Sequence, residues 1–237
     1  MKNSKQPIFR KFRGLQNRCN RALSIFIIGP MLLFGQCSEA FPEMDGLDAV
    51  LLSNSLKKYL FATQSTYPGT LKRTTDANGI EGADAICAFE KFTNFSQLPG
   101  ADNEYRALLV SDHRRACTSA NCNSGGSSEH LDWVLTPNTS YYNPDDQFLF
   151  TTNSNSVLDL STTPLSRVLT TTVAFYWTGF ESTGDWRTST VPETCGNWNT
   201  GGTGMRGDAS TTGPTALGDF GQDSLCGTAH ALICVRR

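Results

Sequence analysis

Cysteines are the residues whose chemistry says most about this chain of 237 residues, which contains eight of them. Cys19 and Cys37 lie near the N-terminus. The other six are spread over the rest of the chain: Cys87, Cys117, Cys122, Cys195, Cys226 and Cys234. Thiolates can hold zinc or act as nucleophiles, but an even number of cysteines in an exported domain favours disulfides. Six cysteines allow about 15 pairings, so their number alone selects none of them.

The N-terminal segment predicts export. A basic stretch without acidic residues carries seven cations: Lys2, Lys5, Arg10, Lys11, Arg13, Arg18 and Arg21. The apolar run that follows, residues 22–34, is shorter than the about 20 residues that a membrane-spanning helix needs, which is typical of a signal peptide. It closes on Phe34, Gly35, Gln36 and Cys37, a pattern typical of a bacterial lipoprotein signal, with an ordinary secretory signal as the alternative.

We therefore expect a signal peptide over residues 1–36, a tether over 37–57 and one domain over 58–237. Cleavage would make Cys37 the N-terminus, and two or more acyl chains on it would anchor the protein stably to a membrane. The family resemblance given below implies that this anchored protein lies at the outer membrane or the cell surface.

The predicted domain is acidic once the signal is removed. The whole chain has 20 Lys and Arg against 22 Asp and Glu. Without the seven cations of the signal, 13 remain against 22, which gives a net charge near −9. Nucleic-acid binding requires clustered cations to neutralise phosphates, so this charge argues against a nucleic-acid partner.

Catalytic and metal-binding patterns are weak. The chain has three histidines and contains neither a Gly-x-Ser-x-Gly elbow nor a His-Glu-x-x-His helix. His113, Cys117, Cys122 and His130 are loosely suitable zinc ligands, but export makes a disulfide the favoured state of the two cysteines. We expect no metal, no cofactor and no enzymatic activity.

Two short stretches are candidates for binding a partner. Arg114 and Arg115, with His113 beside them, form a local basic cluster, which would bind an anionic ligand or simply be a solvated loop. Arg206, Gly207 and Asp208 form an Arg-Gly-Asp tripeptide in a Gly-rich loop. A flexible turn there would present the guanidinium and the carboxylate on opposite sides, as integrins require, although chance occurrence is the interpretation that we favour.

These residues must be positioned by a small number of elements. Apolar residues at 80, 83, 86, 87 and 89 define the inward face of a helix over 80–92, with Cys87 on that face. One or two helical turns are expected over 129–135. Strands are expected over 58–63, 105–110, 147–151 and 167–171 and around Trp177 and Ile233. The sequence thus predicts an α+β domain with a mixed, mostly antiparallel sheet, two short helices and disulfide staples.

The four tryptophans are expected to serve mainly in packing. Trp186 and Trp198 flank a variable loop, so we expect them to be partly exposed and to contact a ligand.

Several motifs together resemble the C-type-lectin-like fold and, more narrowly, endostatin. The early ones are Gly82-Ala83-Asp84 with Cys87, and Tyr105-Arg106-Ala107-Leu108-Leu109. The late ones are Phe175-Tyr176-Trp177-Thr178-Gly179, Thr194-Cys195-Gly196-Asn197-Trp198, and the segment from Cys226 to Cys234. With a lipoprotein signal in front, the chain is similar to the leptospiral endostatin-like (Len) surface lipoproteins. The resemblance covers about residues 58–237.

The resemblance implies three disulfides, Cys87–Cys234, Cys195–Cys226 and Cys117–Cys122. It does not carry over the metal sites of these folds. Thr136-Pro137-Asn138 lacks the carboxylate that calcium demands in a sugar-binding loop, and the mature N-terminus has no histidines for an endostatin-like zinc site.

The function that the resemblance implies is that of a surface adhesin. Such a protein would bind host extracellular-matrix proteins, laminin and fibronectin, and for some members plasminogen or complement factor H. The contact would be made by exposed loops over 111–128, 138–170 and 199–225. The alternatives are a carbohydrate-binding lectin without the usual calcium motif, and an enzyme on the same fold, by analogy with formylglycine-generating proteins. Only the Cys117–Cys122 pair supports the enzyme.

Overall fold

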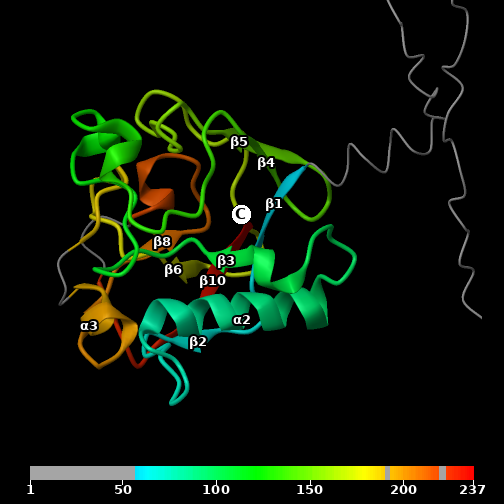
Figure 1. The fold of residues 1–237 in the computed structure, drawn as a ribbon, viewed down its shortest axis with the longest axis vertical. Coiled ribbons are helices and arrows are strands. Elements are labelled where there is room, and N and C mark those ends of the chain that lie inside the picture. The colour runs from blue at the N-terminus through cyan, green and yellow to red at the C-terminus, as the bar shows by residue number, and fades with distance from the viewer. Residues whose placement is uncertain (1–56, 190–192, 219–222) are drawn as a thin grey trace, which may run out of the picture. The chain divides into compact units, whose positions relative to one another are not determined.

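The C-terminal strand β10 (Ala229–Arg236) lies at the centre of the fold (Figure 1). The computed structural model describes residues 57–189, 193–218 and 223–237. Positions 230–235 of β10 are all buried, and such a continuous buried run is typical of a strand covered on both faces. The expected signal peptide, Cys37 and the tether up to residue 56 lie outside the described residues.

Strand β10 is paired along both edges in an eight-stranded sheet. β1 (Lys58–Ala62) and β3 (Tyr105–Ala107) run antiparallel to it, and β6 (Phe175–Trp177) runs parallel. The strand order is β5-β4-β1-β10-β6-β8, with β2 and β3 as further partners of β10. The remaining strands are β2 (Tyr67–Pro68), β4 (Ser140–Tyr142), β5 (Phe148–Thr151), β7 (Thr203–Gly204), β8 (Arg206–Asp208) and β9 (Ser224–Leu225). Most pairings are antiparallel, which confirms the predicted α+β class with a mixed sheet.

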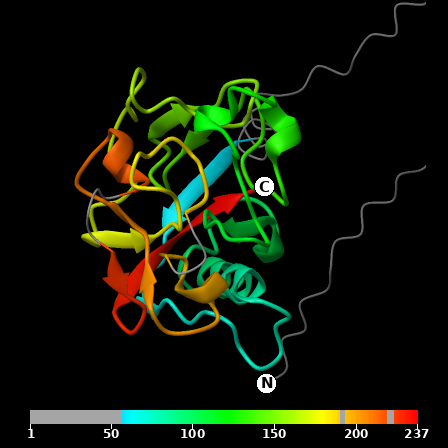
Figure 2. The same cartoon turned by 90° about the vertical axis from the view of Figure 1, so that its left-hand side faces the viewer.

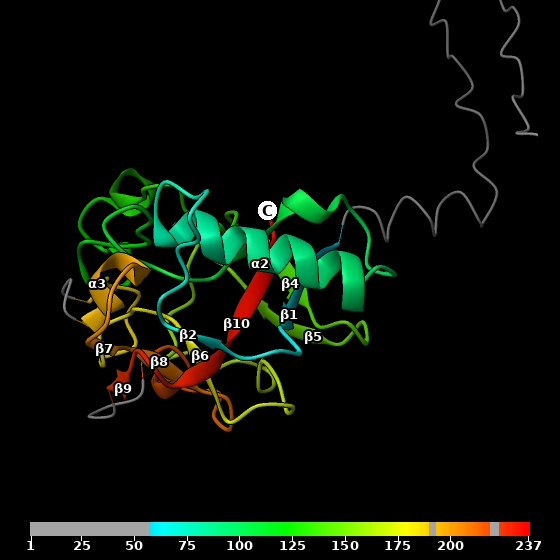
Figure 3. The ribbon, with the colours of Figure 1, turned by 90° about the horizontal axis from the view of Figure 1, so that it is seen from below.

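Helix α2 (Gly79–Asn94) covers one face of this sheet and crosses β10 and β1 (Figure 3). Its start is fixed locally, because the side chain of Asn78 accepts a hydrogen bond from the backbone N–H of Glu81 at 3.0 Å. The sheet-facing side includes Ile80 and Cys87, both buried. The helix predicted over 80–92 is therefore confirmed.

Phe89 was expected on the inward face of α2, and that expectation is wrong. Its side chain is 61% exposed, and that of Phe92 is 64% exposed. Phe89 follows Cys87 by two residues, which is about 200° around a helix with 3.6 residues per turn. Because Cys87 faces the sheet, Phe89 must face away from it.

Alternation along the central strands divides the core into two layers. Phe61 of β1 and Leu232 of β10 belong to the layer beneath α2. Leu60 and Ile233, their immediate neighbours in the sequence, belong to the layer on the opposite face. Long irregular segments fill much of that second layer, and Figure 2 shows them lying beside the crossing strands β1 and β10.

Two of the predicted elements are wrong. Helical turns were expected over 129–135, but a 3-10 turn over Gly126–Glu129 ends there and Leu131 forms an extended bridge with Arg115. A strand was expected over 167–171, but none forms. The hydroxyl of Thr170 instead accepts a hydrogen bond from the backbone N–H of Thr172 at 3.2 Å, so a local turn uses groups that a strand ladder would need.

Short helical turns complete the described part of the chain: α3 (Cys195–Trp198) and 3-10 turns over Asp102–Glu104, Ala120–Cys122, Gly126–Glu129 and Pro214–Ala216. Within the residues described above, no helix combines the length and the apolar character needed to cross a membrane.

Candidate functional site

Three disulfides staple the domain, and they are the three pairs that the resemblance implies. Cys87–Cys234 joins α2 to β10 across 147 residues of sequence. Cys195–Cys226 and Cys117–Cys122 are more local, with sequence separations of 31 and 5. Because Cys117 and Cys122 are bonded to each other, neither offers the free thiol on which the enzyme alternative depends.

Arg114, proposed above as an exposed ligand-binding residue, is completely buried. Its guanidinium lies 2.8 Å from a carboxylate oxygen of Asp84 and 2.7 Å from one of Asp132. It also donates a hydrogen bond to the backbone oxygen of Ala107 at 3.0 Å. A buried guanidinium needs this many acceptors to offset its desolvation. Arg114 therefore joins α2, β3 and the loop before β4, and it is not available to a ligand.

Arg115 differs from its neighbour because it is only half-buried. Its Nε donates to the backbone oxygen of Glu129 at 3.0 Å. Among the described residues, no carboxylate lies within 4.0 Å of its guanidinium. Arg115 is thus a cation at the surface whose charge is not neutralised by the part of the chain described here.

The side chain of Glu129 organises the loop that contains the Cys117–Cys122 disulfide. Its carboxylate accepts hydrogen bonds from the backbone N–H and hydroxyl of both Thr118 and Ser119, and from the N–H of Gly125, at 2.6–2.8 Å. Desolvation alone would raise the pKa of Glu129, but these hydrogen bonds outweigh it and lower the pKa to about 2. The two sulfurs and the carboxylate lie close together, yet all three groups are already engaged, so they do not form a metal centre.

Trp186 and Trp198 are buried, with 2% and 0% of their surface exposed, so the expectation that they contact a ligand is wrong. The indole N–H of Trp186 donates to the backbone oxygen of Leu158 at 2.5 Å, and that of Trp198 donates to Val110 at 2.9 Å. An indole ring is large and mostly apolar and has one N–H donor. A buried site that supplies one hydrogen-bond acceptor therefore stabilises it. Both tryptophans hold loops in place and face inward.

The Arg-Gly-Asp tripeptide is not the flexible turn that was expected, because it forms strand β8. Strand pairing places Arg206 and Asp208 on the same face of the sheet, not on opposite sides. The Arg206 guanidinium lies 3.6 Å from the ring centroid of Phe175. Gly207 is buried, and the carboxylate of Asp208 accepts two hydrogen bonds from Ser210 at 2.7 and 2.8 Å. This arrangement does not fit the grip of an integrin.

The surface around Arg115 is formed by loops that are tied to one another, and we call it the loop face. It consists of three segments: 111–131, 181–187 and 194–202. The N–H of Asn121 donates to the backbone oxygen of Asp185 at 2.8 Å. Asp112 and Asn197 exchange two hydrogen bonds, at 3.0 and 3.1 Å. The green, yellow and orange loops that carry these segments lie together at one end of the domain in Figures 1 and 3.

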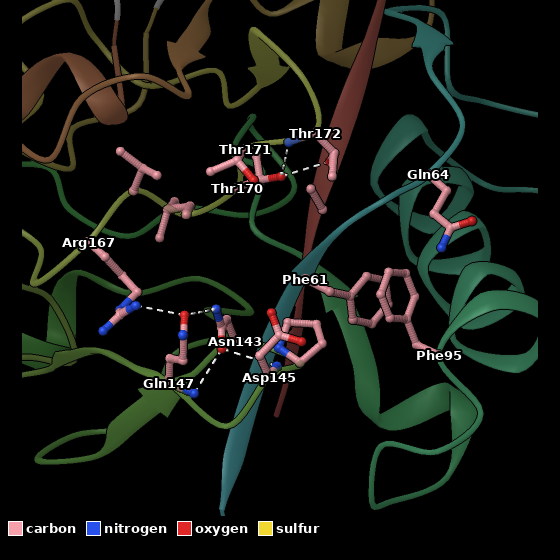
Figure 4. A pocket seen from close by; sticks show the side chains of 14 residues that line it. Phe61, Gln64, Phe95, Asn143, Asp145, Gln147, Arg167, Thr170, Thr171 and Thr172 are labelled. Atoms are coloured by element: carbon pink, nitrogen blue, oxygen red, sulfur yellow. Dashed lines mark hydrogen bonds between the residues drawn. The ribbon is translucent and has the colours of Figure 1, made fainter.

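A separate pocket lies beside β1, and we call it the side pocket (Figure 4). Its volume is about 380 Å³, within the range of small-ligand sites. Its lining residues include aromatic, amide and charged side chains: Phe61, Gln64, Phe95, Asp145, Gln147 and Arg167. These residues come from β1 and the turn after it, the end of α2, and the loops before β5 and β6. None of the lining residues belongs to the loop face.

No pattern in the sequence predicted the side pocket. Asn143-Pro144-Asp145 is a turn signal, and it lies within the loop over 138–170 that was expected to contact a host protein, with no pocket predicted there. Nothing in the sequence indicates that Arg167, some twenty positions later, lies beside that turn. The hydrogen bond from Arg167 to Gln147, at 2.6 Å, exists only in the folded chain.

The fold and these surfaces define a small α+β domain that is stapled by three disulfides. Within that class, the chain belongs to the family described as "Protein of unknown function (DUF1554)", which matches residues 70–214. A search of curated proteins found none that matches this chain.

Proposed function

We propose that this protein is an exported lipoprotein that binds host extracellular-matrix proteins through its loop face. Laminin and fibronectin are the first candidates, with plasminogen and complement factor H after them. The proposal follows the resemblance to leptospiral endostatin-like lipoproteins and includes a C-type-lectin-like, endostatin-like fold for the domain. Cys37 would carry the lipid anchor and hold the domain at the cell surface.

The observation that carries the proposal is the loop face itself. The loops are irregular and polar, which is typical of segments that bind rather than pack. They are nevertheless fixed in place by the Cys117–Cys122 disulfide, by the five hydrogen bonds to Glu129 and by the Asp112–Asn197 pair. A surface that is already ordered loses little conformational entropy on binding, which favours affinity.

Arg115 gives this surface a chemical preference. Its guanidinium is half-buried and lacks a carboxylate partner among the described residues, whereas Arg187 on the same face lies 2.8 Å from Asp185. A partner that offers a carboxylate can pair with Arg115 without first breaking an internal ion pair. Arginine is also among the residue types that most often dominate binding energy. The expected contact is therefore an acidic patch on the host protein.

Solid-phase binding of the purified chain to immobilised laminin and fibronectin tests the proposal. Arg115→Ala should weaken binding about tenfold, which corresponds to about 1.4 kcal/mol. Lys72→Ala is the matched control, because it removes an exposed cation outside the loop face and should leave binding unchanged.

Two further measurements complete the test. Reduction and alkylation should abolish binding, because the loops lose their fixed arrangement. Binding should also weaken as salt is raised, since a cation is part of the contact. If the chain binds none of the host proteins, the adhesin function is refuted. If the Arg115 variant binds as tightly as the wild type, the assignment of binding to the loop face is refuted.

A further inference from the structure

Arg115 and Leu131 lie opposite each other on the loop face, so a cation and an apolar side chain are neighbours there. The two residues form an antiparallel bridge. The N–H of Arg115 donates to the backbone oxygen of Leu131 at 2.9 Å, and the N–H of Leu131 donates to that of Arg115 at 3.0 Å. Residues paired in this way have their side chains on the same side of the bridge, about 5.5 Å apart.

Both side chains point to solvent. The residues on either side of Arg115, which are Arg114 and Ala116, are completely buried. Successive side chains of an extended segment point to opposite sides, so Arg115 points away from the core. Leu131 has the same direction, since 41% of its surface is exposed. The pair is therefore within reach of a partner.

The guanidinium of Arg115 is oriented by the fold. Its Nε donates to the backbone oxygen of Glu129 at 3.0 Å. Its Nη1 and Nη2 make no hydrogen bond to the described residues. These two nitrogens form a planar fork whose spacing matches the two oxygens of a carboxylate. One end of the guanidinium is thus anchored, and the other end is open to an acceptor.

The two carboxylates that are nearest along the chain do not occupy this fork. Glu129 is buried, and its carboxylate accepts five hydrogen bonds from other residues. Asp132 lies 2.7 Å from the guanidinium of Arg114 and 2.8 Å from that of Arg237. Because both carboxylates are held elsewhere, an acidic group from a partner can take the fork.

We propose that Arg115 and Leu131 together bind an acidic side chain that has a large apolar side chain beside it on the partner protein. This inference rests on the proposed function, because it names the surface that the loop face would contact. The carboxylate pairs with the fork of Arg115, and the apolar neighbour covers Leu131 and removes its surface from water. Side chains four positions apart on a helix, or opposite each other on paired strands, lie about 5–6 Å apart and match the spacing of the pair.

A sulfated polysaccharide fits this site less well. Polyanions bind through many clustered cations, whereas Arg187, the other arginine of the loop face, is already paired with Asp185 at 2.8 Å. A polyanion would also leave Leu131 exposed. The pair therefore favours an acidic and apolar protein surface.

NMR titration of the purified, isotope-labelled chain with small molecules tests the site without any host protein. The probes are 4-methylpentanoate, which has a carboxylate and a branched apolar end, and acetate, its truncated form. 4-Methylpentanamide is the neutral match, and inorganic sulfate is an anion without an apolar part. 4-Methylpentanoate should bind at least about fivefold more tightly than each of the others, because only it satisfies both side chains. The amide signals of Arg115 and Leu131 should shift most.

Variants separate the two halves of the site. Leu131→Ala should lower the affinity for 4-methylpentanoate to that for acetate, and Arg115→Gln should remove the binding of both carboxylates. Leu225→Ala is the matched control, because Leu225 is 68% exposed and belongs to β9, outside the loop face. That variant should bind all four probes as the wild type does. The comparison of probes on the wild type remains decisive even where a variant is unstable.

Three results would overturn the inference: equal affinity of the wild type for 4-methylpentanoate and acetate, full affinity of Leu131→Ala for 4-methylpentanoate, or sulfate as the tightest ligand. Laminin and fibronectin binding is a separate arm, in which Leu131→Ala should bind about fivefold more weakly than the wild type. A chain that prefers 4-methylpentanoate but binds no host protein would refute the adhesin function and leave the site intact. Host binding that Leu131→Ala leaves unchanged would refute the inference and leave the adhesin function intact.

Discussion

Replacing Arg114 by methionine should destabilise the domain strongly without removing any of its apolar core. The guanidinium is completely buried. It donates six hydrogen bonds, to the carboxylates of Asp84 and Asp132 and to the backbone oxygens of Asp132 and Ala107. Methionine keeps an unbranched apolar stem and removes the guanidinium with its charge and its donors. The carboxylates would then remain without their main partner.

The remaining partners limit the size of the effect. Removing one member of a buried ion pair typically destabilises a protein by about 3–5 kcal/mol. Asp84 keeps Arg106 at 3.2 Å, and Asp132 keeps Arg237 at 2.8 Å. Both of these arginines are part-exposed, so their compensation is incomplete. We therefore expect a loss near the lower limit, about 3 kcal/mol.

Urea unfolding at pH 7, followed by tryptophan fluorescence without reductant, measures the loss. Arg73→Met is the matched control, because its ion pair with Asp76, at 2.8 Å, involves a half-exposed guanidinium. That variant should lose no more than about 1 kcal/mol. High salt should reduce the loss of unfolding free energy in the Arg73 variant more than the loss in the Arg114 variant. Equal losses below about 1 kcal/mol in both variants would contradict the reasoning, because Arg114 would then behave as a surface residue.

Three further predictions concern stability. Glu129→Gln should cost about 2–3 kcal/mol at pH 7, because hydrogen bonds hold the folded pKa of Glu129 at about 2 against an ordinary value of 4.5. Since the folded pKa is the lower one, this contribution is complete above about pH 4.5 and is lost as the pH falls towards 2. Unfolding free energies measured from pH 7 to pH 3 should therefore converge for wild type and variant, and a constant difference would contradict this. Replacing Cys87 and Cys234 together by alanine should lower the free energy of unfolding by about 5 kcal/mol in the entropic model, because the bond closes a long loop. A loss under about 1 kcal/mol in urea unfolding would contradict that estimate. Gly207→Ala should cost about 1–3 kcal/mol, because a Cβ there would overlap a backbone oxygen, whereas Gly201→Ala meets nothing within 4 Å and should be neutral in thermal unfolding.

Local features of this chain were readable from the sequence. The helix α2 was predicted because the apolar spacing that defines it lies within one short segment. The apolar run that forms β10 also lies within one segment, and the cysteines only had to be counted, so both features could be recognised from the sequence. The choice of disulfide partners was not, because it came from the resemblance to a known fold.

Neighbouring residues of the same type show where sequence reasoning stops. Arg114 and Arg115 look alike in the sequence, yet one is buried and the other is half-exposed. Adjacent residues of an extended segment point in opposite directions. Which of them faces inward depends on Asp84, some thirty positions earlier. No local pattern contains that information.

The sequence by itself predicted most of the elements, the abundance of disulfides and the acidic charge of this domain, and it led us to expect export. The tertiary structure decided which side chains a ligand can reach. It buried Trp198, placed Arg206 in a paired strand, and brought Arg167 beside Gln147 in the lining of the side pocket. The physical reason is that secondary structure depends on nearby residues, whereas burial and pocket formation depend on which distant segments become neighbours.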